Sequence, residues 1–316
     1  MQRRMLGNSG ISVAPLALGG NVFGWTIDEK TSFAVLDAFV DGGFDLIDTA
    51  NVYSMWAPGN KGGESETIIG RWLKQSGKRD KIVFATKVGK PLGRSTGLKR
   101  EHIMIGVEES LQRLNVDVID LYQSHSDDPN SPLDETLAAF DSLVKQGKVR
   151  AIGASNFSAE RLEESITISN EKGLASYDTL QPEYNLYDRK EFEETLLPVC
   201  LKHGISVISY YSLANGFLSG KYRTSDDLHQ SVRGATIGKR YMNERGFRIL
   251  DALDQVAKEH GTVPTVVAIA WLIHRATIAA PIVSATSTAQ LVDLIKATEL
   301  NLSAEEMTLL DAASAY

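Results

Sequence analysis

The sequence lacks the features that define several protein classes. Its 316 residues include one cysteine, Cys200, which excludes an internal disulfide and a cysteine-rich zinc site. Its 33 Lys and Arg residues are outnumbered by 40 Asp and Glu residues, and the resulting net charge of −7 argues against nucleic-acid binding. No apolar run reaches the roughly 20 residues of a membrane span, and no apolar segment of the secretory type follows the basic N-terminal residues. We therefore expect a cytoplasmic protein that binds neither nucleic acid nor membranes. Its oligomeric state is left open.

What the sequence does contain is a slow alternation of β-rich and helical patterns. Several β-rich runs are almost continuously apolar, which is typical of parallel strands covered on both faces. Eight such runs are predicted to be strands: Pro15–Gly20, Phe44–Ala50, Ile82–Val88, Ile119–His125, Val149–Asn156, Tyr177–Tyr184, Ile205–Tyr211 and Ala279–Ala285. Helical spacing of apolar residues lies between them, most clearly at Thr31–Val40, Arg100–Leu114 and Ser131–Gly147.

Eight strand and helix units in turn predict a (β/α)8 barrel, with residues 1–316 as a single domain. The competing α/β architecture is a doubly wound open sheet, but no G-x-G-x-x-G follows the first strand. Residues 1–13, with Asn8-Ser9-Gly10 in the middle, predict a β-hairpin before the barrel. The mixed polar segment at about 216–246 predicts a long loop beside the ligand site, because loops of that length are usually functional or mobile.

Polar side chains end six of the eight apolar runs. In a barrel these strand ends converge on one mouth, where active sites are built. The residues concerned are Asp48, Lys87, His125, Ser155-Asn156, Gln181 and Tyr210-Tyr211. Taken singly, each has an ordinary structural explanation, such as a turn cap or a solvated charge. Packing alone does not readily explain polar residues at the same end of six predicted strands.

Four residues near these ends suit the reduction of a carbonyl group. The reaction needs a proton for the developing alkoxide, and the Tyr53 hydroxyl is a candidate donor. An ammonium group, Lys87, is expected to lower the tyrosine pKa, and a carboxylate, Asp48, to hold that ammonium in place. His125 is the candidate for orienting the carbonyl oxygen.

The surrounding segments resemble the aldo-keto reductase family over essentially the whole chain. GGFDLIDTANVY followed by GGESETIIG is similar to the family's Asp-x4-Tyr segment and the helix start after it. FATKV resembles the strand that carries the family's lysine, and SLQRLNVDVIDLYQSH the segment that carries its histidine. The resemblance implies a barrel that reduces carbonyls with a nicotinamide cofactor bound across its mouth. It also implies Asp48, Tyr53, Lys87 and His125 as the catalytic tetrad.

The resemblance also implies the residues that bind the cofactor. Ser155, Asn156 and Gln181 would bind the nicotinamide carboxamide. Tyr210 would stack on the nicotinamide ring, with Tyr211 as the alternative one residue further on. The segment that follows would lie along the pyrophosphate, with Lys221 adding charge: Ser212, Leu213, Gly216 and Lys221.

The segment PIVSATSTAQLVDLI departs from the pattern of relatives that use NADPH. Thr286 and Gln290 stand where basic residues are expected, and no Lys or Arg occurs between Arg275 and Lys296. The hydroxyls of Ser284, Thr286, Ser287 and Thr288 suit a free ribose hydroxyl as well as a weakly bound phosphate. Ser284, Thr286 and Gln290 are the predicted cofactor residues of this segment. The cofactor is therefore NADP(H) or NAD(H), with NAD(H) a serious candidate. A cation of the 216–246 segment is the alternative phosphate ligand: Arg223, Arg233, Lys239 or Arg240.

The substrate is expected to be a small carbonyl or alcohol, such as an aldehyde, a ketone or an aldose. Trp25 and Trp56 are candidates for the pocket wall, together with Tyr122 or Ser126. Two other functions compete with the oxidoreductase. One is a nicotinamide-binding regulatory subunit with little turnover. The other is a metal-dependent hydrolase or isomerase, which is disfavoured because the other five histidines fall in helical or loop segments, so no metal site is expected.

Overall fold

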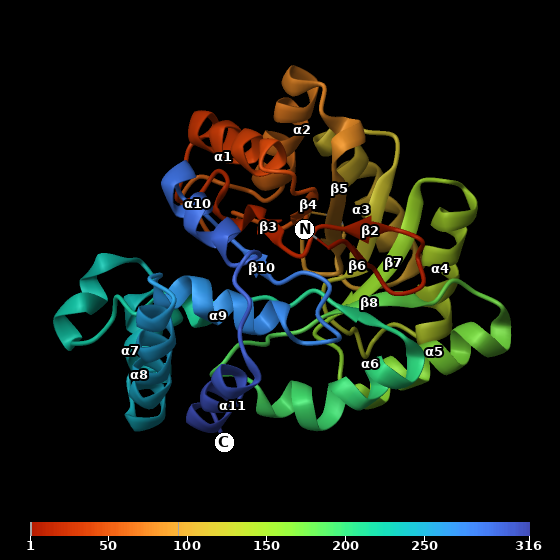
Figure 1. Cartoon of the computed structure of the whole chain (residues 1–316). Coiled ribbons are helices and arrows are strands. Elements are labelled where there is room, and N and C mark those ends of the chain that lie inside the picture. The colour runs from red at the N-terminus through yellow and green to blue at the C-terminus, as the bar shows by residue number, and fades with distance from the viewer. Residues whose placement is uncertain (1, 94) are drawn as a thin grey trace.

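The computed structural model describes residues 2–93 and 95–316, and its centre is a ring of eight parallel strands (Figure 1). In ring order they are β10 (Ile282–Val283), β3 (Ala17–Gly19), β4 (Leu46–Asp48), β5 (Val83–Val88), β6 (Ile119–Ser124), β7 (Val149–Ser155), β8 (Tyr177–Gln181) and β9 (Ser206–Val207). The ring closes where the Ile282 N–H donates to the Ser209 carbonyl at 2.8 Å. The predicted (β/α)8 barrel is confirmed, although every strand is shorter than the apolar run that predicted it.

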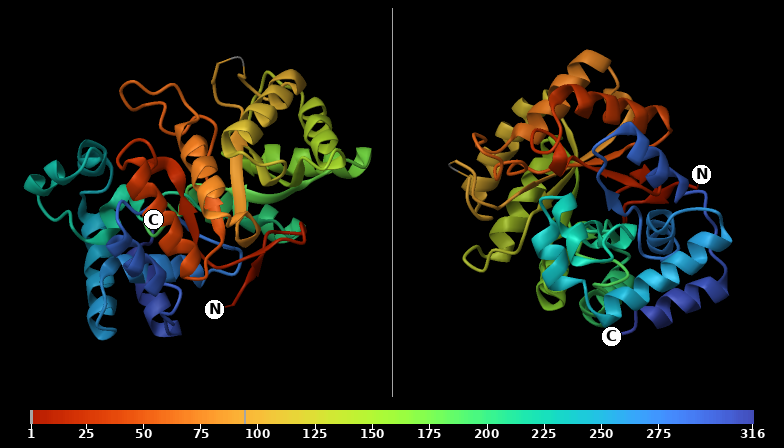
Figure 2. Two further views of the ribbon diagram at one scale, coloured as in Figure 1. Left: turned by 90° about the horizontal axis from the view of Figure 1, so that it is seen from above. Right: turned by 90° about the vertical axis from the view of Figure 1, so that its left-hand side faces the viewer.

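Helices lie around the strands, as both views of Figure 2 show. Their bounds are α1 (Glu29–Asp41), α2 (Glu64–Ser76), α3 (Arg100–Leu114), α4 (Leu133–Lys145), α5 (Ala159–Lys172), α6 (Leu197–His203), α8 (Glu244–Glu259), α9 (Pro264–Ile273), α10 (Thr288–Lys296) and α11 (Ala304–Ala313). A π-helical turn, Phe192–Leu196, leads directly into α6. The bounds of α3 match the prediction. The start of α1 lies two residues earlier than predicted, because the Asp28 side chain caps it by accepting from the Thr31 N–H.

Inward-facing residues change from apolar to polar along the strands that carry the predicted site. On β5, Val83 and Ala85 point into the barrel core, and Lys87, two residues further on, takes the same face at the mouth. A separate apolar cluster fills the barrel interior, whereas the larger core lies between the strands and the helices. The interior cluster is Leu6, Ile11, Val13, Ala17, Leu46, Val83, Ala85, Leu121, Ala151, Ile208, Ala279 and Ala280. The period of two thus carries polar side chains to the C-terminal mouth above an apolar floor.

The predicted N-terminal hairpin is present and closes the other end of the barrel. Strands β1 (Arg4–Met5) and β2 (Ser12–Val13) pair antiparallel. Gly7, in the turn, has φ of 55° and lies so close to β8 that a Cβ there would come within 2.1 Å of the Asp178 carbonyl oxygen. Only glycine permits this approach. The Asp178 carboxyl is half-buried beside the hairpin, and burial raises its pKa to about 6.

The segment predicted as a loop at about 216–246 is largely helical, so that prediction is wrong in its detail. It contains the 3-10 turns η4 (Ala214–Ser219) and η5 (Ser225–Gln230) and the helix α7 (Gly234–Arg240). These elements are short and carry few apolar residues, so they leave no periodic pattern in the sequence. Figure 1 shows them projecting from the barrel beside α8.

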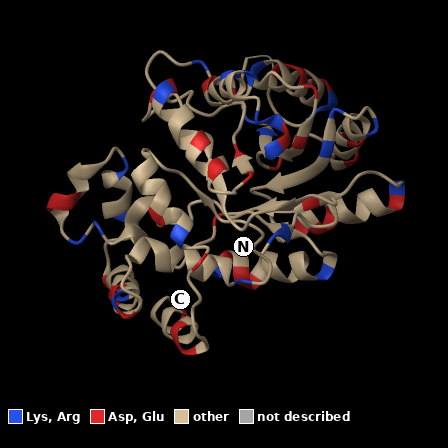
Figure 3. Ribbon diagram, turned by 45° about the horizontal axis from the view of Figure 1, so that its top comes forward, with Lys and Arg blue, Asp and Glu red and all other residues tan. Residues whose placement is uncertain are grey.

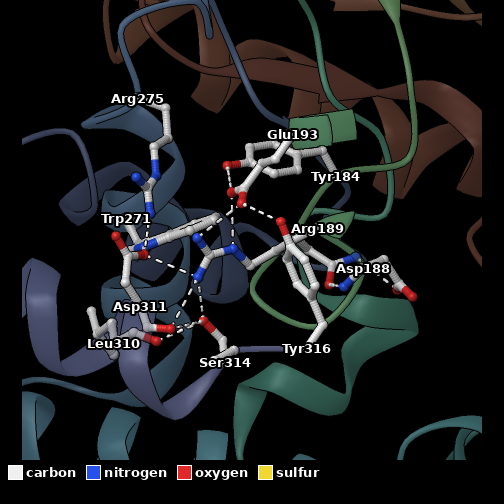
Figure 4. Close-up of polar contacts among 12 residues, drawn as sticks. Tyr184, Asp188, Arg189, Glu193, Trp271, Arg275, Leu310, Asp311, Ser314 and Tyr316 are labelled. Atoms are coloured by element: carbon white, nitrogen blue, oxygen red, sulfur yellow. Dashed lines mark hydrogen bonds and ion pairs between the residues drawn. The ribbon is translucent and has the colours of Figure 1, made fainter. Parts of the chain in front are cut away.

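A buried arginine fixes the C-terminal helix to the barrel (Figure 4). The Arg189 guanidinium binds both Glu193 carboxylate oxygens, at 2.9 and 3.1 Å, and it also contacts the Asp311 carboxylate in α11 and the hydroxyl of Ser314, which caps that helix. Trp271 of α9 donates its indole N–H to the same Asp311 at 2.9 Å. Because the charges are paired and hydrogen-bonded, their burial is tolerated.

The charged residues of both signs are interspersed over the helices in the view of Figure 3. Among the residues that the structure describes, no helix is long and apolar enough to cross a membrane.

Asp178→Asn is expected to stabilise the protein at pH 8 by about 1 kcal/mol and to have little effect at pH 4. Because the pKa of Asp178 is raised in the folded state, the unfolded chain releases this proton first as the pH rises from about 4 to 6, and stability is lost over that window. Urea unfolding at both pH values measures the difference, with Asp117→Asn at an exposed carboxylate as the control. An equal gain at both pH values would contradict the electrostatic explanation.

Candidate active site

The four predicted catalytic residues lie together at the C-terminal mouth of the barrel. Asp48 is the last residue of β4, Lys87 lies near the end of β5, and His125 directly follows β6. Tyr53 lies on the loop between β4 and α2. The parallel register pairs Asp48 with Ala85, which places the carboxylate two residues before Lys87 on the adjacent strand.

The Lys87 ammonium is fully buried and uses each of its three protons in a hydrogen bond. It donates to the Asp48 carboxylate at 2.7 Å, to the Thr49 carbonyl at 2.8 Å and to the Tyr53 hydroxyl oxygen at 2.8 Å. The Tyr53 hydroxyl lies 3.4 Å from the same carboxylate oxygen. This arrangement satisfies a charge that would otherwise be costly to bury.

The Asp48 carboxylate has further support from two glutamines. Its second oxygen accepts from the Gln181 amide at 2.8 Å and lies 3.4 Å from the Gln123 amide. Gln123 was not among the predicted site residues. The signal for it was present, because Gln123 precedes His125 by two residues and therefore faces the same way on a strand.

Besides Asp48, a second carboxylate is buried near the site, on the outer side of β5, and the sequence did not predict it. Glu66, in the first turn of α2, is fully buried and accepts from the Thr86 hydroxyl at 2.5 Å and from the Arg113 guanidinium at 2.7 Å. These bonds tie α2 to β5 and α3. They anchor the far end of the loop that carries Tyr53.

The pKa of the Tyr53 hydroxyl is shifted in the direction opposite to the prediction. We predicted that Lys87 lowers it, but burial and the negative charge of Asp48 raise the pKa of the hydroxyl well above 10. Burial also lowers the pKa of Lys87, and the adjacent Asp48 opposes that effect. The free protein therefore holds Tyr53 protonated near neutral pH, as a proton donor must be.

His125 is buried and uncharged at neutral pH. Burial, with smaller effects from the Lys87 and Lys90 charges, lowers the pKa of its imidazole well below 6.5. The ring lies 5.9 Å from the Tyr53 ring, centroid to centroid, at 75°. Its Nδ1 atom has no hydrogen-bond partner among the described residues. A neutral imidazole can hydrogen-bond a substrate oxygen without adding a charge to the mouth.

Hydrogen bonds link Ser155, Asn156 and Gln181, the three residues predicted to bind a carboxamide, to one another and to the end of β6. The Ser155 hydroxyl donates to the Gln181 carbonyl at 2.9 Å. The Asn156 amide donates to the His125 carbonyl at 2.9 Å and to the Ser155 hydroxyl oxygen at 3.0 Å. The Asn156 oxygen accepts from the Tyr210 hydroxyl at 2.7 Å. The ends of β6, β7, β8 and β9 are thereby joined.

The two neighbouring tyrosines differ in their surroundings. Tyr210 is half-buried, and its hydroxyl is engaged by Asn156. The Tyr211 side chain is 43% exposed, and its ring lies at 77° to that of Tyr210 with a centroid distance of 5.1 Å.

Backbone strain is concentrated in the loops at the mouth. Of the six non-glycine residues with positive φ in the described chain, Asn115 ends α3. The other five follow β4, β7 and β9: Ser54, Asn156, Tyr211, Ala214 and Asn215. Such residues cost about 1 kcal/mol each and cluster at functional sites. The Leu213–Gly216 segment, predicted to lie along a pyrophosphate, shows this strain at Ala214 and Asn215, which is more typical of a functional loop than of a simple connection.

The remaining predicted cofactor residues lie along the segments after β9 and β10. The Ser212 hydroxyl donates to the Ile282 carbonyl at 2.7 Å, and Lys221 is exposed, with its ammonium 5.1 Å from the centre of the Tyr222 ring. The Ser284 hydroxyl contacts the Asn21 amide oxygen at 2.6 Å. The Gln290 oxygen accepts from both the backbone N–H and the hydroxyl of Thr286, each at 2.9 Å.

Two of the alternative phosphate ligands have carboxylate partners. Arg223 pairs with Asp254, and Arg240 pairs with Glu183 and Asp188. Arg233 lies over the Trp25 ring at 5.7 Å. Among the residues that the structure describes, no contact of the Lys239 side chain places it at the Thr286 segment.

Aromatic rings extend from Tyr53 along one side of the mouth. Trp56 packs edge-on against Tyr53, with a centroid distance of 6.1 Å, and against Trp25 at 5.5 Å. Ser126 follows the histidine and is half-buried. Tyr122, the other candidate, is not part of the wall. It faces outward from β6 and packs on Phe140, because it lies one residue out of phase with Gln123.

A comparison with protein-family models agrees with the fold. Residues 15–315 match the model of the aldo/keto reductase family. The chain belongs to this family, as its motifs predict, and is related to its oxidoreductases.

The similar proteins include some named as oxidoreductases and some named as potassium channel subunits. An uncharacterized oxidoreductase, YrpG, of Bacillus subtilis is 34% identical over 98% of this chain and 95% of its own. The aldo-keto reductase YhdN of the same organism is 36% identical over 84% of this chain and 78% of its own. A probable voltage-gated potassium channel subunit beta of Arabidopsis thaliana is 31% identical over 95% of this chain and 92% of its own.

Lys87→Met is expected to destabilise the protein by about 3–5 kcal/mol, because it leaves the Asp48 carboxylate buried without its ammonium partner. Adding Asp48→Asn to that variant should restore part of the loss. Denaturant unfolding measures both changes. Lys172→Met, which removes an exposed pair with Asp134, is the control and should have little effect. A double variant no more stable than Lys87→Met would contradict the charge-pair explanation.

Proposed function

We propose that this protein is an NAD(P)(H)-dependent oxidoreductase that interconverts a small carbonyl compound and its alcohol. The observation that carries the proposal is the buried contact of Lys87 with both Asp48 and the Tyr53 hydroxyl oxygen. A protonated tyrosine beside a fixed ammonium is suited to transferring a proton to an oxygen that becomes negatively charged.

In reduction, the nicotinamide would supply the hydride to the carbonyl carbon when it is bound. Tyr53 donates its proton to the substrate oxygen as negative charge develops there. The Lys87 N–H that already points at the tyrosine oxygen stabilises the phenolate that forms, and Asp48 keeps the lysine in place. In oxidation the same groups act in reverse, and Tyr53 takes the proton.

His125 has the second role. Its low pKa keeps the imidazole neutral, and its position beside Tyr53 suits a hydrogen bond to the substrate oxygen. A neutral donor stabilises the charge that develops in the transition state without drawing the proton away from Tyr53.

The strained and hydrogen-bonded loops after β7, β8 and β9 are the proposed cofactor site. Ser155, Asn156 and Gln181 would hold the carboxamide. Tyr211 is better placed than Tyr210 to stack on the nicotinamide, because its ring is exposed and the Tyr210 hydroxyl is engaged. The diphosphate would follow the next segment, through Ser212, Leu213, Gly216 and Lys221.

The substrate would lie between Tyr53 and the rings of Trp56 and Trp25. An aromatic wall of this kind suits aryl aldehydes, ketones and aldoses. We infer an aldehyde, a ketone or an aldose as the substrate class.

A nicotinamide-binding regulatory subunit is the second candidate, supported by the name of the plant relative. The two functions share the cofactor site and differ in turnover. The intact contacts around Tyr53 favour the enzyme.

Tyr53→Phe is expected to lower kcat by about 100-fold or more while leaving cofactor affinity nearly unchanged, because only the proton donor is removed. Steady-state assays with a panel of aldoses, aryl aldehydes and pyridoxal, run with both cofactors, supply the measurement. Near-normal turnover in the variant would exclude Tyr53 as the acid. No turnover of any panel member by the wild type, with tight cofactor binding, would favour the regulatory subunit.

NADH is expected to bind at least as tightly as NADPH, because Thr286 and Gln290 are bonded to each other and offer no cation to a 2′-phosphate. Fluorescence titration of both cofactors measures this. Tenfold tighter binding of NADPH would mean that a cation of the 216–246 segment supplies the missing charge, and Lys239→Ala and Arg233→Ala would then identify it.

A further inference from the structure

The N-terminal end of the barrel, opposite the mouth, carries a cavity of about 300 Å³. It lies among the starts of β7 and β8, the helix α5 and the residues that follow α6. The buried side chains of Ile152, Ile166 and Ile205 contribute to its lining. Because a cavity of this volume lies at the lower end of the range for ligand sites, it suits a small organic molecule with an apolar part.

A β-bulge brings a carboxylate residue, Asp178, to the lining of this cavity. Tyr177 of β8 pairs with Ile152 of β7, whereas Thr179 pairs with Gly153, the very next residue of β7. Asp178 is therefore the extra residue of β8 and has no partner in the ladder with β7. Bulges are known to redirect a side chain away from the regular alternation of a strand. Here the redirected residue lines the cavity.

The charge of Asp178 is not compensated within the cavity. Its carboxyl is half-buried and has no ion-pair partner among the residues that the structure describes. Arg150 and His203 also line the cavity, but Arg150 donates to the Asp120 carboxylate at 2.7 Å, and His203 contacts the Glu163 carboxylate at 2.9 Å. Burial raises the pKa of Asp178 to about 6, and neither cation reverses that shift. The cavity therefore favours a positively charged ligand over a negatively charged one.

Hydrogen-bond acceptors lie around the same cavity. Asn8 of the hairpin turn, Asn170 of α5 and Ser176 before β8 line it, and their side chains have no hydrogen-bond partner in the described part of the chain. A primary ammonium has three protons. It can donate to the Asp178 carboxylate and to two of these side-chain oxygens, while a short apolar chain covers the buried isoleucines.

We propose that this cavity binds a small organic cation, a primary ammonium group on a short apolar chain, with the Asp178 carboxylate as its anchor. The site lies at the opposite end of the barrel from Tyr53 and shares no residue with the candidate active site, so it does not depend on the proposed function. A ligand that binds only the folded state shifts the unfolding equilibrium. Occupancy therefore offsets the loss of stability that the unpaired carboxylate causes.

Calorimetric titration of the wild type at pH 7.5 tests the site with three probes of equal chain length: n-butylammonium, 1-butanol and butyrate. Butylammonium should bind with a Kd on the order of 1 mM, which is reasonable for so small a ligand. The alcohol, which keeps the chain and lacks the charge, should bind at least about tenfold more weakly. Butyrate should not bind, because its charge has the same sign as that of Asp178.

Asp178→Asn is the decisive variant, because it removes the charge and keeps the shape of the side chain. It should weaken butylammonium by about tenfold or more and leave 1-butanol unchanged. Asp117→Asn, at an exposed carboxylate outside the cavity, is the matched control and should bind butylammonium like the wild type. Equal affinity of wild type and Asp178→Asn for butylammonium would overturn the proposal, as would a wild type that binds no butylammonium or binds butyrate more tightly.

Proton release gives an independent measurement of the same contact. At pH 6 about half of the free protein carries a proton on Asp178, and an ammonium that pairs with the carboxylate displaces this proton. Binding should therefore release about half a proton per butylammonium at pH 6. Comparing the binding heats in phosphate and in MES, two buffers with different heats of ionisation, measures the release. Binding without proton release would show that the ligand is held elsewhere and would refute the role of Asp178.

Discussion

The mouth of this barrel depends on one buried ammonium. Lys87 is fully buried, and its three protons go to a carboxylate, a carbonyl and a phenol oxygen. A charge in that position is tolerated only while Asp48 stays beside it, and Asp48 in turn is held by Gln181 and Gln123. The position of the Tyr53 oxygen is therefore set by a chain of contacts that reaches across four strands. Loss of any one of them would leave a buried polar group without a partner.

This chain of contacts is possible because side chains alternate between the two faces of each strand. Residues two apart on a strand share a face, so a strand that fills the interior with Val83 and Ala85 delivers Lys87 to the mouth. The same step places Gln123 and His125 in line on β6. The apolar floor excludes water from below, which strengthens the interactions above it. The hairpin at the far end completes that floor with Leu6, Ile11 and Val13. The apolar end of the barrel therefore contributes to stability, whereas the mouth carries the candidate active site.

The proposed cofactor side of the mouth is built differently from the side that carries Lys87. The side-chain donors of Ser155, Asn156 and Gln181 are hydrogen-bonded within the protein, and the backbone after β9 holds several residues in left-handed conformations. Both features make the surface rigid before a ligand arrives, which lowers the ordering cost of binding. The bonded pair of Thr286 and Gln290 is equally preorganised, and it lacks the positive charge that a phosphate needs.

The sequence by itself determined the family, the eight strands and the four residues that meet at the mouth, Asp48, Tyr53, Lys87 and His125, because alternation along a strand and the motifs at strand ends are local properties. It also determined the hairpin and the bounds of α3. Only the tertiary structure decided the sign of the Tyr53 pKa shift, since that depends on burial and on a carboxylate from another strand. The same holds for Glu66 and Gln123, whose partners are distant in sequence, for Tyr122, which faces away from the mouth, and for the short helices within 216–246. Periodicity shows which face a residue takes, whereas its charge state and its partners are properties of the closed barrel.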